Sequence, residues 1–360
     1  MEKPSISTFH AVMLLVGSTG LLNHVLIIPM ILQEVGRDAW ISVLGTTGLA
    51  LLWMPLLYVI TKRTSQQHLM KWFQTSYGKW LANVLGVWVA LYLLLVSVST
   101  LKDMLTWTKV SYMTQTPTLA LLVLFLALCF VNAMAGIQSV GAIGGILIPV
   151  VIVFGFFVMF GNMHQKNYHQ LLPFLEHGWS PLLNGVLYAG AGFTELMYLV
   201  LMQHHVRKPI RFRTFLLVCL AFLGLTLGPL IGAIAEFGVF EAAGQRYPAY
   251  EEWRLLYIGR YVEHVDFLSI YQWLSGAFVR ISLSMYLIPD VLRVKERKQR
   301  RWVMLGVSVC IGALVLWPIS DMKFFDLLTR FGVPMLTLWL WVFSLVVGIL
   351  VLVRRKQKGV

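Results

Sequence analysis

The chain has 360 residues, of which 58% are hydrophobic and 12% are charged, and its formal net charge is +13. A soluble globular domain carries about 25% charged residues. This composition excludes an ordinary soluble enzyme or binding domain and predicts an integral membrane protein. We assign the positive charge to membrane topology and to contact with anionic lipid in the bilayer, and we expect no nucleic acid partner.

Ten apolar runs follow one another along the chain. A helix that spans a membrane needs about 20 apolar residues. The runs are roughly 8–33, 39–61, 80–101, 117–135, 140–161, 181–202, 214–235, 267–289, 302–319 and 331–353. They predict an all-α integral membrane protein with ten transmembrane helices, folded as a single polytopic domain over residues 1–360.

Lysine and arginine residues are distributed unevenly between the predicted loops. If the N-terminus lies inside, the inner segments hold 19 of them and the outer segments hold 9. Inner loops of membrane proteins carry the excess of positive charge. Both termini are therefore predicted to be cytoplasmic.

One predicted outer loop, 236–266, is longer than the others. Pro248 can start a helix within it. Trp253, Leu256, Tyr257 and Tyr261 would then fall on one helix face. We expect an amphipathic helix on the outer surface, which acts either as a lid or as a connector packed on that surface.

The first and sixth runs share an interruption near the middle of the span. The first contains Gly17-Ser18-Thr19-Gly20, and the sixth contains Gly190-Ala191-Gly192 followed by Glu195. Paired interruptions in two halves are typical of inverted-repeat transporters. The pattern predicts a 5+5 inverted repeat with discontinuous helices 1 and 6, repeat one about 8–161 and repeat two about 181–353. The alternative for each glycine pair is close helix packing.

A broken helix at membrane depth exposes main-chain groups to a cavity. The free N–H groups at a helix N-terminus suit a carboxylate, and free carbonyl groups suit an ammonium. One such pocket could hold a zwitterion, and an α-amino acid is the simplest zwitterion. The interrupted segments are therefore predicted to bind a ligand of this class.

Glu195 is the only acidic residue within a predicted span. Ionisable groups at this depth are costly and usually have a partner or a functional role. Three roles remain open. Glu195 could form an ion pair with Arg280, the only basic residue within a span; it could be a protonatable coupling site; or it could contact the ligand's ammonium or organise the unwound segment.

Further polar residues could line the same pocket. Ser275, Ser282 and Tyr286 share a face of the eighth run, and Tyr92 lies in the middle of the third. The alternatives are serine hydrogen bonds to their own helix and core packing of Tyr92. The sequence contains no recognisable enzyme motif, and we expect no catalytic residue, cofactor or metal. His204 and His205 are interpreted as part of a basic anchor.

The segment RYPAYEEWRLLYIGRYVEHVDFLSIYQWLSGAFVRISLSMYLIPDVL (246–292) resembles the signature region of the spore germination permease family. Its tyrosine-proline, Trp-Arg, Ile-Gly and Asp266 elements carry the resemblance, which extends over nearly the whole chain. Members of this family are the B subunits of nutrient germinant receptors, and they resemble the amino acid–polyamine–organocation transporter superfamily.

The resemblance implies a nutrient sensor in the spore inner membrane that acts with a larger A subunit and a lipoprotein C subunit. It implies a ligand site at Gly17–Gly20, Tyr92, Gly190–Glu195, Ser282 and Tyr286. One departure is the interval between Gly20 and Pro29, which is longer than the family commonly has and leaves the ligand's identity open. The alternatives are a proton-coupled amino acid symporter of the same fold and a structural subunit with a degenerate pocket.

Overall fold

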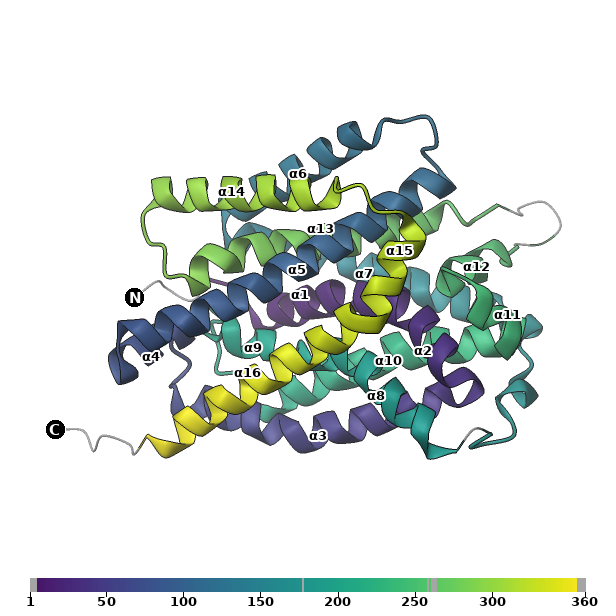
Figure 1. Ribbon diagram of the computed structural model, residues 1–360, viewed down its shortest axis with the longest axis horizontal. Helices are drawn as coiled ribbons and strands as arrows, with labels where there is room; N and C mark the ends of the chain where they lie inside the picture. The colour runs from purple at the N-terminus through teal and green to yellow at the C-terminus, as the bar shows by residue number, and fades with distance from the viewer. Residues whose placement is uncertain (1–4, 177, 258, 260–263, 355–360) are drawn as a thin grey trace.

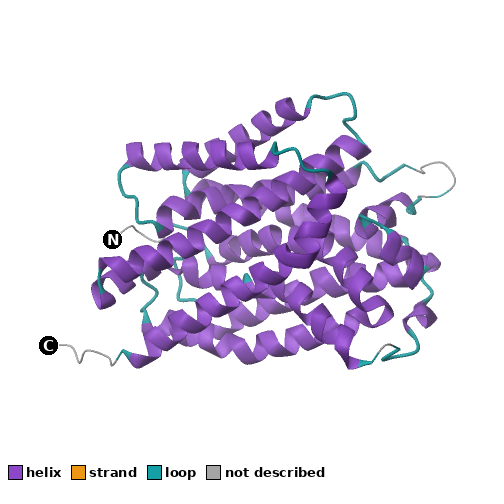
Figure 2. Cartoon of the chain, in the orientation of Figure 1, coloured by secondary structure: helices purple, strands orange, loops and turns teal. Residues whose placement is uncertain are grey.

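A computed structural model describes residues 5–176, 178–257, 259 and 264–354, and these fold almost entirely into helices (Figures 1 and 2). The two ends of the chain emerge on the same side of the molecule, at the left of Figure 1, together with helix α4 (Leu69–Tyr77). We call this side the terminal end. The side that carries α11 (Val239–Gly244) and α12 (Pro248–Arg254) is called the opposite end.

The first half of the chain contains seven α-helices and four short helical segments of other kinds. They are α1 (Thr8–Leu21), the π-helix η1 (Leu22–Leu26), α2 (Ile27–Val35), the 3₁₀ segment η2 (Gly36–Asp38), α3 (Ala39–Arg63), α4, α5 (Lys79–Ser111), α6 (Thr118–Ala135), α7 (Ile137–Gly161), and the 3₁₀ segments η3 (Met163–Gln165) and η4 (Tyr168–Leu171). A single residue, Gly136, turns the chain between α6 and α7 with a φ of +98°. Glycine adopts this left-handed conformation without steric cost.

The second half is built in the same way. It contains α8 (Trp179–Thr194), α9 (Met197–Leu201), the 3₁₀ segment η5 (Gln203–His205), α10 (Phe212–Phe237), α11, α12, α13 (Leu268–Val291), α14 (Arg297–Val315), α15 (Asp321–Leu327), the π-helix η6 (Leu328–Gly332) and α16 (Val333–Val353). Helix α12 begins at Pro248, the residue at which the sequence predicts a helix start.

Seven helices in the described residues are long and apolar enough to cross a membrane. The first of these stretches, Thr8–Arg63, contains the first two predicted runs. The runs 181–202 and 302–319 correspond to α8 with α9 and to α14, which are not among the seven. The helix of run 181–202 is divided at Glu195 and Leu196, and α14 begins with a basic segment. The chain is a multi-pass membrane protein, and the number of ten crossings stays a prediction.

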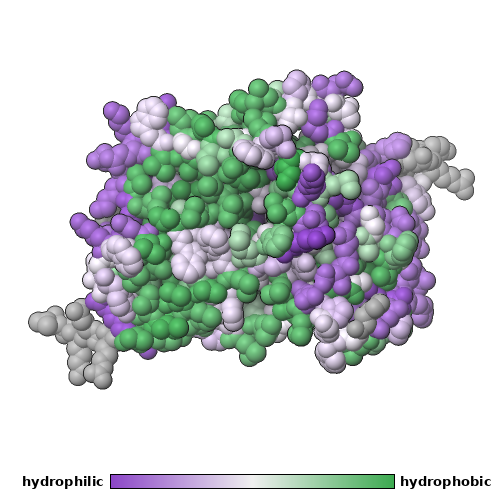
Figure 3. Space-filling model, in the orientation of Figure 1, coloured by the Kyte–Doolittle hydropathy of each residue, from purple (hydrophilic) through white to green (hydrophobic). Residues whose placement is uncertain are grey.

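The surface agrees with this assignment. Apolar side chains cover the middle of the face shown in Figure 3, and hydrophilic side chains gather toward the two ends of the long axis. A membrane protein needs an apolar belt about 30 Å high, because hydrocarbon cannot solvate polar groups. The helices run broadly along the axis that crosses this belt (Figure 1).

Helix packing treats the two halves of the chain as equivalents. Helix α1 packs on α7, as α8 packs on α16; likewise α6 packs on α13, as α14 packs on α5. Two further contacts, α5 with α13 and α3 with α10, each join the matching helices of the two halves. A pseudo-two-fold relation produces this exchange pattern, which supports the predicted repeats at 8–161 and 181–353, although their boundaries stay a prediction.

The start of the described chain is tied to the end of span six. The amide of Ser5 donates a hydrogen bond to the carbonyl of His205 (2.8 Å), and the amide of Arg207 donates to the carbonyl of Ile6 (2.9 Å). A parallel β-bridge between Ile6 and Val206 results. The segment before α1 and the segment after α9 are therefore joined through their backbones at the terminal end.

Candidate functional site

A buried ion pair occupies the centre of the helix bundle. Glu195 follows the last residue of α8, and Arg280 lies in the middle of α13. The guanidinium Nη2 lies 2.5 Å from Oε1 of the carboxylate, and Nη1 lies 2.8 Å from Oε2. Both residues are almost completely buried. Two parallel hydrogen bonds of this kind give a strong and directional pair.

Helices α1 and α5 complete the hydrogen bonds of the pair. The hydroxyl of Thr19 donates to Oε2 of Glu195 (2.6 Å), and the hydroxyl of Tyr92 donates to Oε1 (3.2 Å). Arg280 donates from Nη1 to the carbonyl of Ser18 (2.6 Å) and from Nε to Thr100 (3.0 Å). Four helices therefore meet at one satisfied polar centre, which is what a charge pair in a low-dielectric interior requires.

The carbonyl of Ser18 can accept from Arg280 because the backbone changes there. The amide of Leu22 donates to Thr19 rather than to Ser18, as α1 passes into the π-helix η1. The discontinuity of helix 1 is thus the π-helical segment Leu22–Leu26, and the expectation that it lies at Gly17–Gly20 is wrong. All four predicted residues belong to α1.

The two glycines of α1 differ in how closely they are packed. A Cβ at Gly17 would lie 2.4 Å from Cδ1 of Ile148, and one at Gly20 would lie 3.4 Å from Leu225. Glycine at position 17 lets the side chain of Ile148 on α7 lie against α1, whereas the distance at Gly20 is an ordinary van der Waals contact that alanine would also allow. The alternative interpretation of the sequence, close helix packing, therefore applies to Gly17.

The discontinuity of helix 6 also lies beyond its glycines. Gly190, Ala191 and Gly192 belong to α8, so the predicted break at these residues is wrong. The chain departs from the α-helix at Glu195 and Leu196, whose amides bond to the carbonyls three residues earlier. This is a tightened turn and not an unwound segment.

Packing again explains the glycines of α8. A Cβ at Gly192 would lie 1.5 Å from Oδ1 of Asn23, and one at Gly190 would lie 2.7 Å from Cγ2 of Thr337. Because no side chain fits at Gly192, α8 can approach the π-helical part of span one there.

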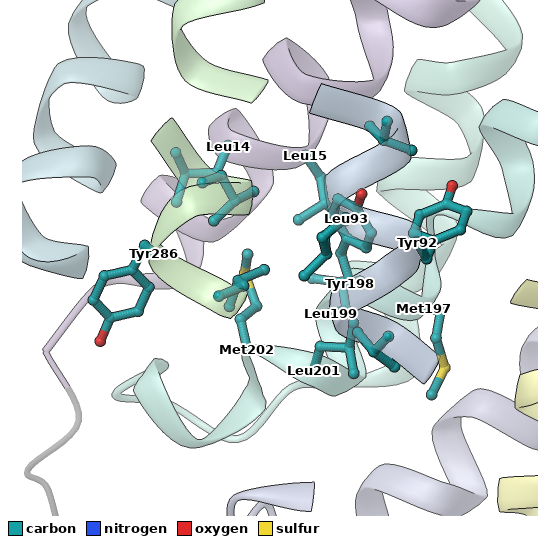
Figure 4. Close-up of a cluster of buried hydrophobic side chains, with 14 of the residues drawn as sticks. Leu14, Leu15, Tyr92, Leu93, Met197, Tyr198, Leu199, Leu201, Met202 and Tyr286 are labelled. Atoms are coloured by element: carbon teal, nitrogen blue, oxygen red, sulfur yellow. The ribbon is translucent and has the colours of Figure 1, made fainter. Parts of the chain in front are cut away.

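Tyr92 lies at the ion pair, whereas two further predicted residues point elsewhere. Ser282 is buried beside the thiol of Cys129 on α6. The hydroxyl of Tyr286 lies 3.4 Å from Nε2 of His205. Figure 4 shows Tyr286 directed away from Tyr92 and Tyr198. The structure thus brings together Ser18, Thr19, Tyr92, Glu195 and Arg280, and it leaves Ser282 and Tyr286 outside this group.

Of the three roles open for Glu195, the structure contains the ion pair with Arg280. Proton coupling and ligand contact stay predictions. The side chains of the pair occupy the position between the two discontinuous helices where the sequence predicts main-chain groups to hold a zwitterion. A ligand at that place would have to displace them.

A cavity of about 640 Å³ lies between α1, α7, α10, α12 and α13, and neither residue of the ion pair lines it. Its walls are mostly aliphatic and aromatic. Among the predicted ligand-binding residues, all of which are described, Gly17 and Gly20 line it. The polar side chains in its wall are His24, Lys166, Tyr168, Glu252 and Gln272. A volume of this order fits a small organic molecule.

The polar wall of the cavity is built largely at the opposite end. Glu252 on α12 is almost completely buried, and its Oε1 has no hydrogen-bond partner in the described part of the chain. Nearby, the ammonium of Lys166 lies 3.3 Å from Oε1 of Glu236. Burial raises the pKa of the Glu252 carboxyl well above its usual range, the neighbouring Glu236 carboxylate raises it further, and Lys166 opposes both.

Helix α12 is held against the bundle by polar contacts that sequence reasoning did not find. Nε1 of Trp253 donates to Oε1 of Gln272 (2.8 Å), and Nδ2 of Asn162 donates to the carbonyl of Glu252 (2.7 Å). The helix ends at Arg254, so Leu256 and Tyr257 lie beyond it, and Tyr261 lies outside the described residues. Helix α12 forms a wall of the cavity.

The remainder of the signature segment anchors the same region. Nη2 of Arg246 donates to Oδ1 of Asp103 (2.6 Å), and the hydroxyl of Tyr247 donates to the same oxygen (3.2 Å). The hydroxyl of Tyr112 donates to Oδ2 of Asp266 (3.0 Å). Both ends of the outer segment are therefore fixed to α5 or to the residue that follows it.

Comparison with known proteins agrees with this architecture. Residues 5–324 match the family described as Spore germination protein. The chain is 42% identical over 353 residues to Spore germination protein XB of Bacillus anthracis, covering 98% of this chain and 99% of that protein. It is 20% identical over 321 residues to Spore germination protein A2 of Bacillus subtilis (strain 168), covering 87% of each.

Solved transporter structures share the fold. MhsT in complex with L-phenylalanine aligns with a TM-score of 0.67 and 14% identity, over 98% of this chain and 99% of that one. Mhp1, a nucleobase-cation-symport-1 family transporter with bromovinylhydantoin bound, aligns with a TM-score of 0.59 and 12% identity, over 97% and 78%. At these identities the likeness shows the fold alone.

Proposed function

This chain belongs to the spore germination protein family, and we propose that it is the B subunit of a nutrient germinant receptor that binds an amino acid or a similar small nutrient within the membrane. We expect it to lie in the spore inner membrane with both termini cytoplasmic. Its partners would be a larger A subunit and a lipoprotein C subunit, which receive the signal.

The observation that carries the ligand proposal is the cavity beside α1. Apolar walls surround most of it, and buried charges stand in one wall. Two carboxylates, Glu236 and Glu252, face one ammonium, Lys166. A ligand amine beside Glu252 would favour the ionised form of this carboxyl, a ligand carboxylate would be drawn to Lys166, and the ligand's side chain would contact the apolar walls. That MhsT holds L-phenylalanine in the same fold supports this choice of ligand class.

The cavity offers a route from ligand to signal. Gly17 and Gly20 line it, and the intervening residues Ser18 and Thr19 hold Arg280 and Glu195. A ligand that presses on this turn of α1 would move both hydrogen bonds together. The ion pair would pass the displacement to the turn between α8 and α9. Binding would then shift the population between two arrangements of span six, which a partner subunit could sense.

The test is a binding screen with a blocked cavity. The full chain, purified in detergent, would be heated with individual amino acids, sugars and nucleosides, because a ligand that binds the folded state raises the melting temperature. Gly228 lines the cavity, and a Cβ there meets no atom within 4 Å, so Gly228→Leu should fill space without strain. The matched control is Gly306→Leu on α14, which also has open space but lies outside the cavity.

We expect at least one amino acid to raise the melting temperature of the wild-type chain and of Gly306→Leu, but not that of Gly228→Leu. Glu252→Gln should weaken binding about tenfold or more, which corresponds to about 1.4 kcal/mol. No shift with any compound would overturn the ligand proposal. An equal shift in Gly228→Leu would place the ligand elsewhere.

The second candidate is a proton-coupled amino acid symporter, favoured by the buried Glu195 and by the transporter fold. Such a carrier would have to release Glu195 from Arg280 during each cycle. Uptake of a labelled amino acid into liposomes that contain the purified chain separates the two functions. Accumulation driven by a pH gradient would favour the symporter, and binding without accumulation would favour the receptor.

A further inference from the structure

A second polar cluster lies at the terminal end, apart from the cavity. His68 precedes the first residue of α4, His204 lies in η5 directly after α9, and Asp290 lies in the last turn of α13. Each of these three side chains offers one potential metal-ligand atom, and these three atoms lie within 4.8 Å of one another. Three separate segments of the chain therefore direct imidazole and carboxylate groups to one point.

The distances fit a tetrahedral metal site. Nε2 of His204 lies 3.3 Å from Oδ2 of Asp290, and Nε2 of His68 lies 3.6 Å from the same oxygen. Metal–ligand bonds of about 2.0–2.2 Å place neighbouring ligands of a tetrahedron about 3.3–3.6 Å apart. The shorter separation is also within hydrogen-bond distance, and both separations match an edge of that tetrahedron.

Two of the groups lack hydrogen bonds that their burial would demand. Nδ1 of His204 has no hydrogen-bond partner among the described residues, and Nε2 of His204 and Oδ2 of Asp290 face each other at 3.3 Å without meeting hydrogen-bond geometry. Buried polar atoms in proteins are nearly always satisfied, and an orphan calls for an explanation such as an ion. We propose that His68, His204 and Asp290 bind a divalent transition-metal ion, with Zn²⁺ as the best-fitting member of that class.

The donor set selects the metal. Imidazole suits Zn²⁺, Cu²⁺ and Ni²⁺, whereas Ca²⁺ and Mg²⁺ require oxygen ligands. Three protein ligands leave a fourth position for water. The carboxylate is oriented by Arg300, whose Nη1 lies 3.9 Å from Oδ1 of Asp290 and leaves Oδ2 facing the histidines.

Metal binding would rearrange the hydrogen bonds of His68. Its Nδ1 accepts from the amide of Lys71 (3.3 Å), and its Nε2 lies 3.0 Å from the carbonyl of Asp290. Coordination through Nε2 moves the ring proton to Nδ1, so α4 exchanges its capping hydrogen bond for a metal ligand. The site therefore links the start of α4 to the ion.

The site joins segments that the proposed receptor mechanism would have to move. Asp290 belongs to α13, which also carries Arg280, and His204 follows the turn that contains Glu195. His205, the next residue, lies 3.5 Å from Oδ2 of Asp290 and bonds to Ser5 through its carbonyl. A bound ion would fasten spans six and eight together at the terminal end and hold one arrangement of the bundle.

The experiment uses the full chain, purified with a tag that contains no histidine. Co²⁺ is the probe, because tetrahedral Co²⁺ has strong visible absorption bands, and Zn²⁺ is then used to displace it. We expect one equivalent of Co²⁺ with a tetrahedral spectrum, full displacement by Zn²⁺, and a higher melting temperature with Zn²⁺.

His204→Gln is the principal variant, because the amide of glutamine can keep a polar contact with Asp290 while it removes the imidazole ligand. It should weaken Co²⁺ binding by more than about tenfold, the least that losing even an outer-shell partner costs. Asp290→Asn should do the same. His169→Ala, at an exposed histidine outside the cluster, should bind as the wild type does.

Absence of a tetrahedral spectrum in the wild-type chain would overturn the proposal. Equal binding by wild type and His204→Gln would also overturn it, because the ion would then sit on surface histidines. Should Asp290→Asn fail to fold, the comparison of His204→Gln with His169→Ala still decides.

Discussion

The guanidinium of Arg280 donates two hydrogen bonds, of 2.5 and 2.8 Å, to the carboxylate of Glu195. Glu195 is the residue at which the α-helix of span six ends. The same guanidinium holds the carbonyl of Ser18, just before span one becomes a π-helix. One side chain of α13 therefore joins the irregular points of both discontinuous helices. Any rearrangement of either helix has to be accommodated at Arg280.

The first prediction concerns Glu195→Gln. The substitution leaves the Arg280 charge buried without its counter-ion, and removing one partner of a buried pair costs about 3–5 kcal/mol. We expect a clear fall in the melting temperature of the purified chain and loss of germination response in spores that carry it. Leu183→Gln, at an exposed position of α8, is the matched control and should have a small effect. Equal, mild effects of both substitutions would contradict the central role of the pair.

The second prediction concerns the contact of α8 with span one. Gly192→Ala would place a Cβ 1.5 Å from Oδ1 of Asn23 on η1, so the buried Asn23 side chain must rotate or the two helices must separate. Overpacking of this kind costs about 1–3 kcal/mol or more. Gly224→Ala on α10, where a Cβ meets no atom within 4 Å, should leave stability unchanged. Thermal unfolding of both variants checks the difference, and a Gly192→Ala chain as stable as wild type would refute the close approach.

The third prediction concerns pH and Glu252. Burial raises the folded-state pKa of this carboxyl above the value of about 4.3 that it has in an unfolded chain. The contribution of this group to the free energy of unfolding is fully present below the unfolded-state pKa. It is lost as pH rises through the folded-state pKa, because the buried carboxyl must then ionise. We expect the melting temperature of the wild type to fall over this range.

Glu252→Gln removes the titrating group and should flatten the profile by at least about 2 °C, the shift that 1 kcal/mol produces in a protein of this size. Glu241→Gln, at an exposed carboxylate on α11, should follow the wild type. Parallel profiles for all three chains would show that Glu252 does not titrate in this range.

The fourth prediction concerns the anchor of the outer segment. Asp103→Asn weakens the hydrogen bonds from Arg246 and Tyr247, at a cost of about 1–3 kcal/mol. The segment that carries α12 should then open more often, so trypsin should cleave after Arg254 faster than in the wild type.

Asp326→Asn is the control. It disrupts an exposed pair with Arg330 and should cost less than about 1 kcal/mol, with no change in cleavage. Unchanged cleavage in Asp103→Asn would mean that other contacts hold the segment.

The helical architecture could be predicted from the sequence because lipid makes local patterns decisive. Every spanning segment must satisfy its own backbone, so a long apolar run can hardly be anything but a helix. The start of α12 at Pro248 was likewise visible, since proline favours the first turn. Helix α12 is shorter than predicted. It ends at Arg254, whereas the helical spacing of apolar residues in the sequence continues beyond that residue.

The position of the helix breaks could not be predicted from the glycines. Gly17 and Gly192 look like helix breakers in a sequence, but their distances to Ile148 and Asn23 show that they serve packing. The actual breaks lie three to five residues further on, at the turn of Glu195–Leu196 and at the π-helix that begins at Leu22. Only the tertiary partner of a glycine distinguishes the two uses.

The cavity and the histidine cluster were also beyond sequence reasoning. Each combines side chains from distant segments, so spacing along the chain carries no trace of it. Glu252 could have been noticed as an acid in an apolar face beside Trp253. His68 and Asp290 carry no local signal, since 222 residues separate them.

The backbone bridge between Ile6 and Val206 makes span one and span six mechanically dependent at the terminal end. A movement of the segment around His205 would therefore be passed to the first turn of α1. A fluorophore attached at Ser5 would therefore report on span six, a helix to which it is not covalently adjacent, and cutting the bridge would silence that readout while leaving both helices intact.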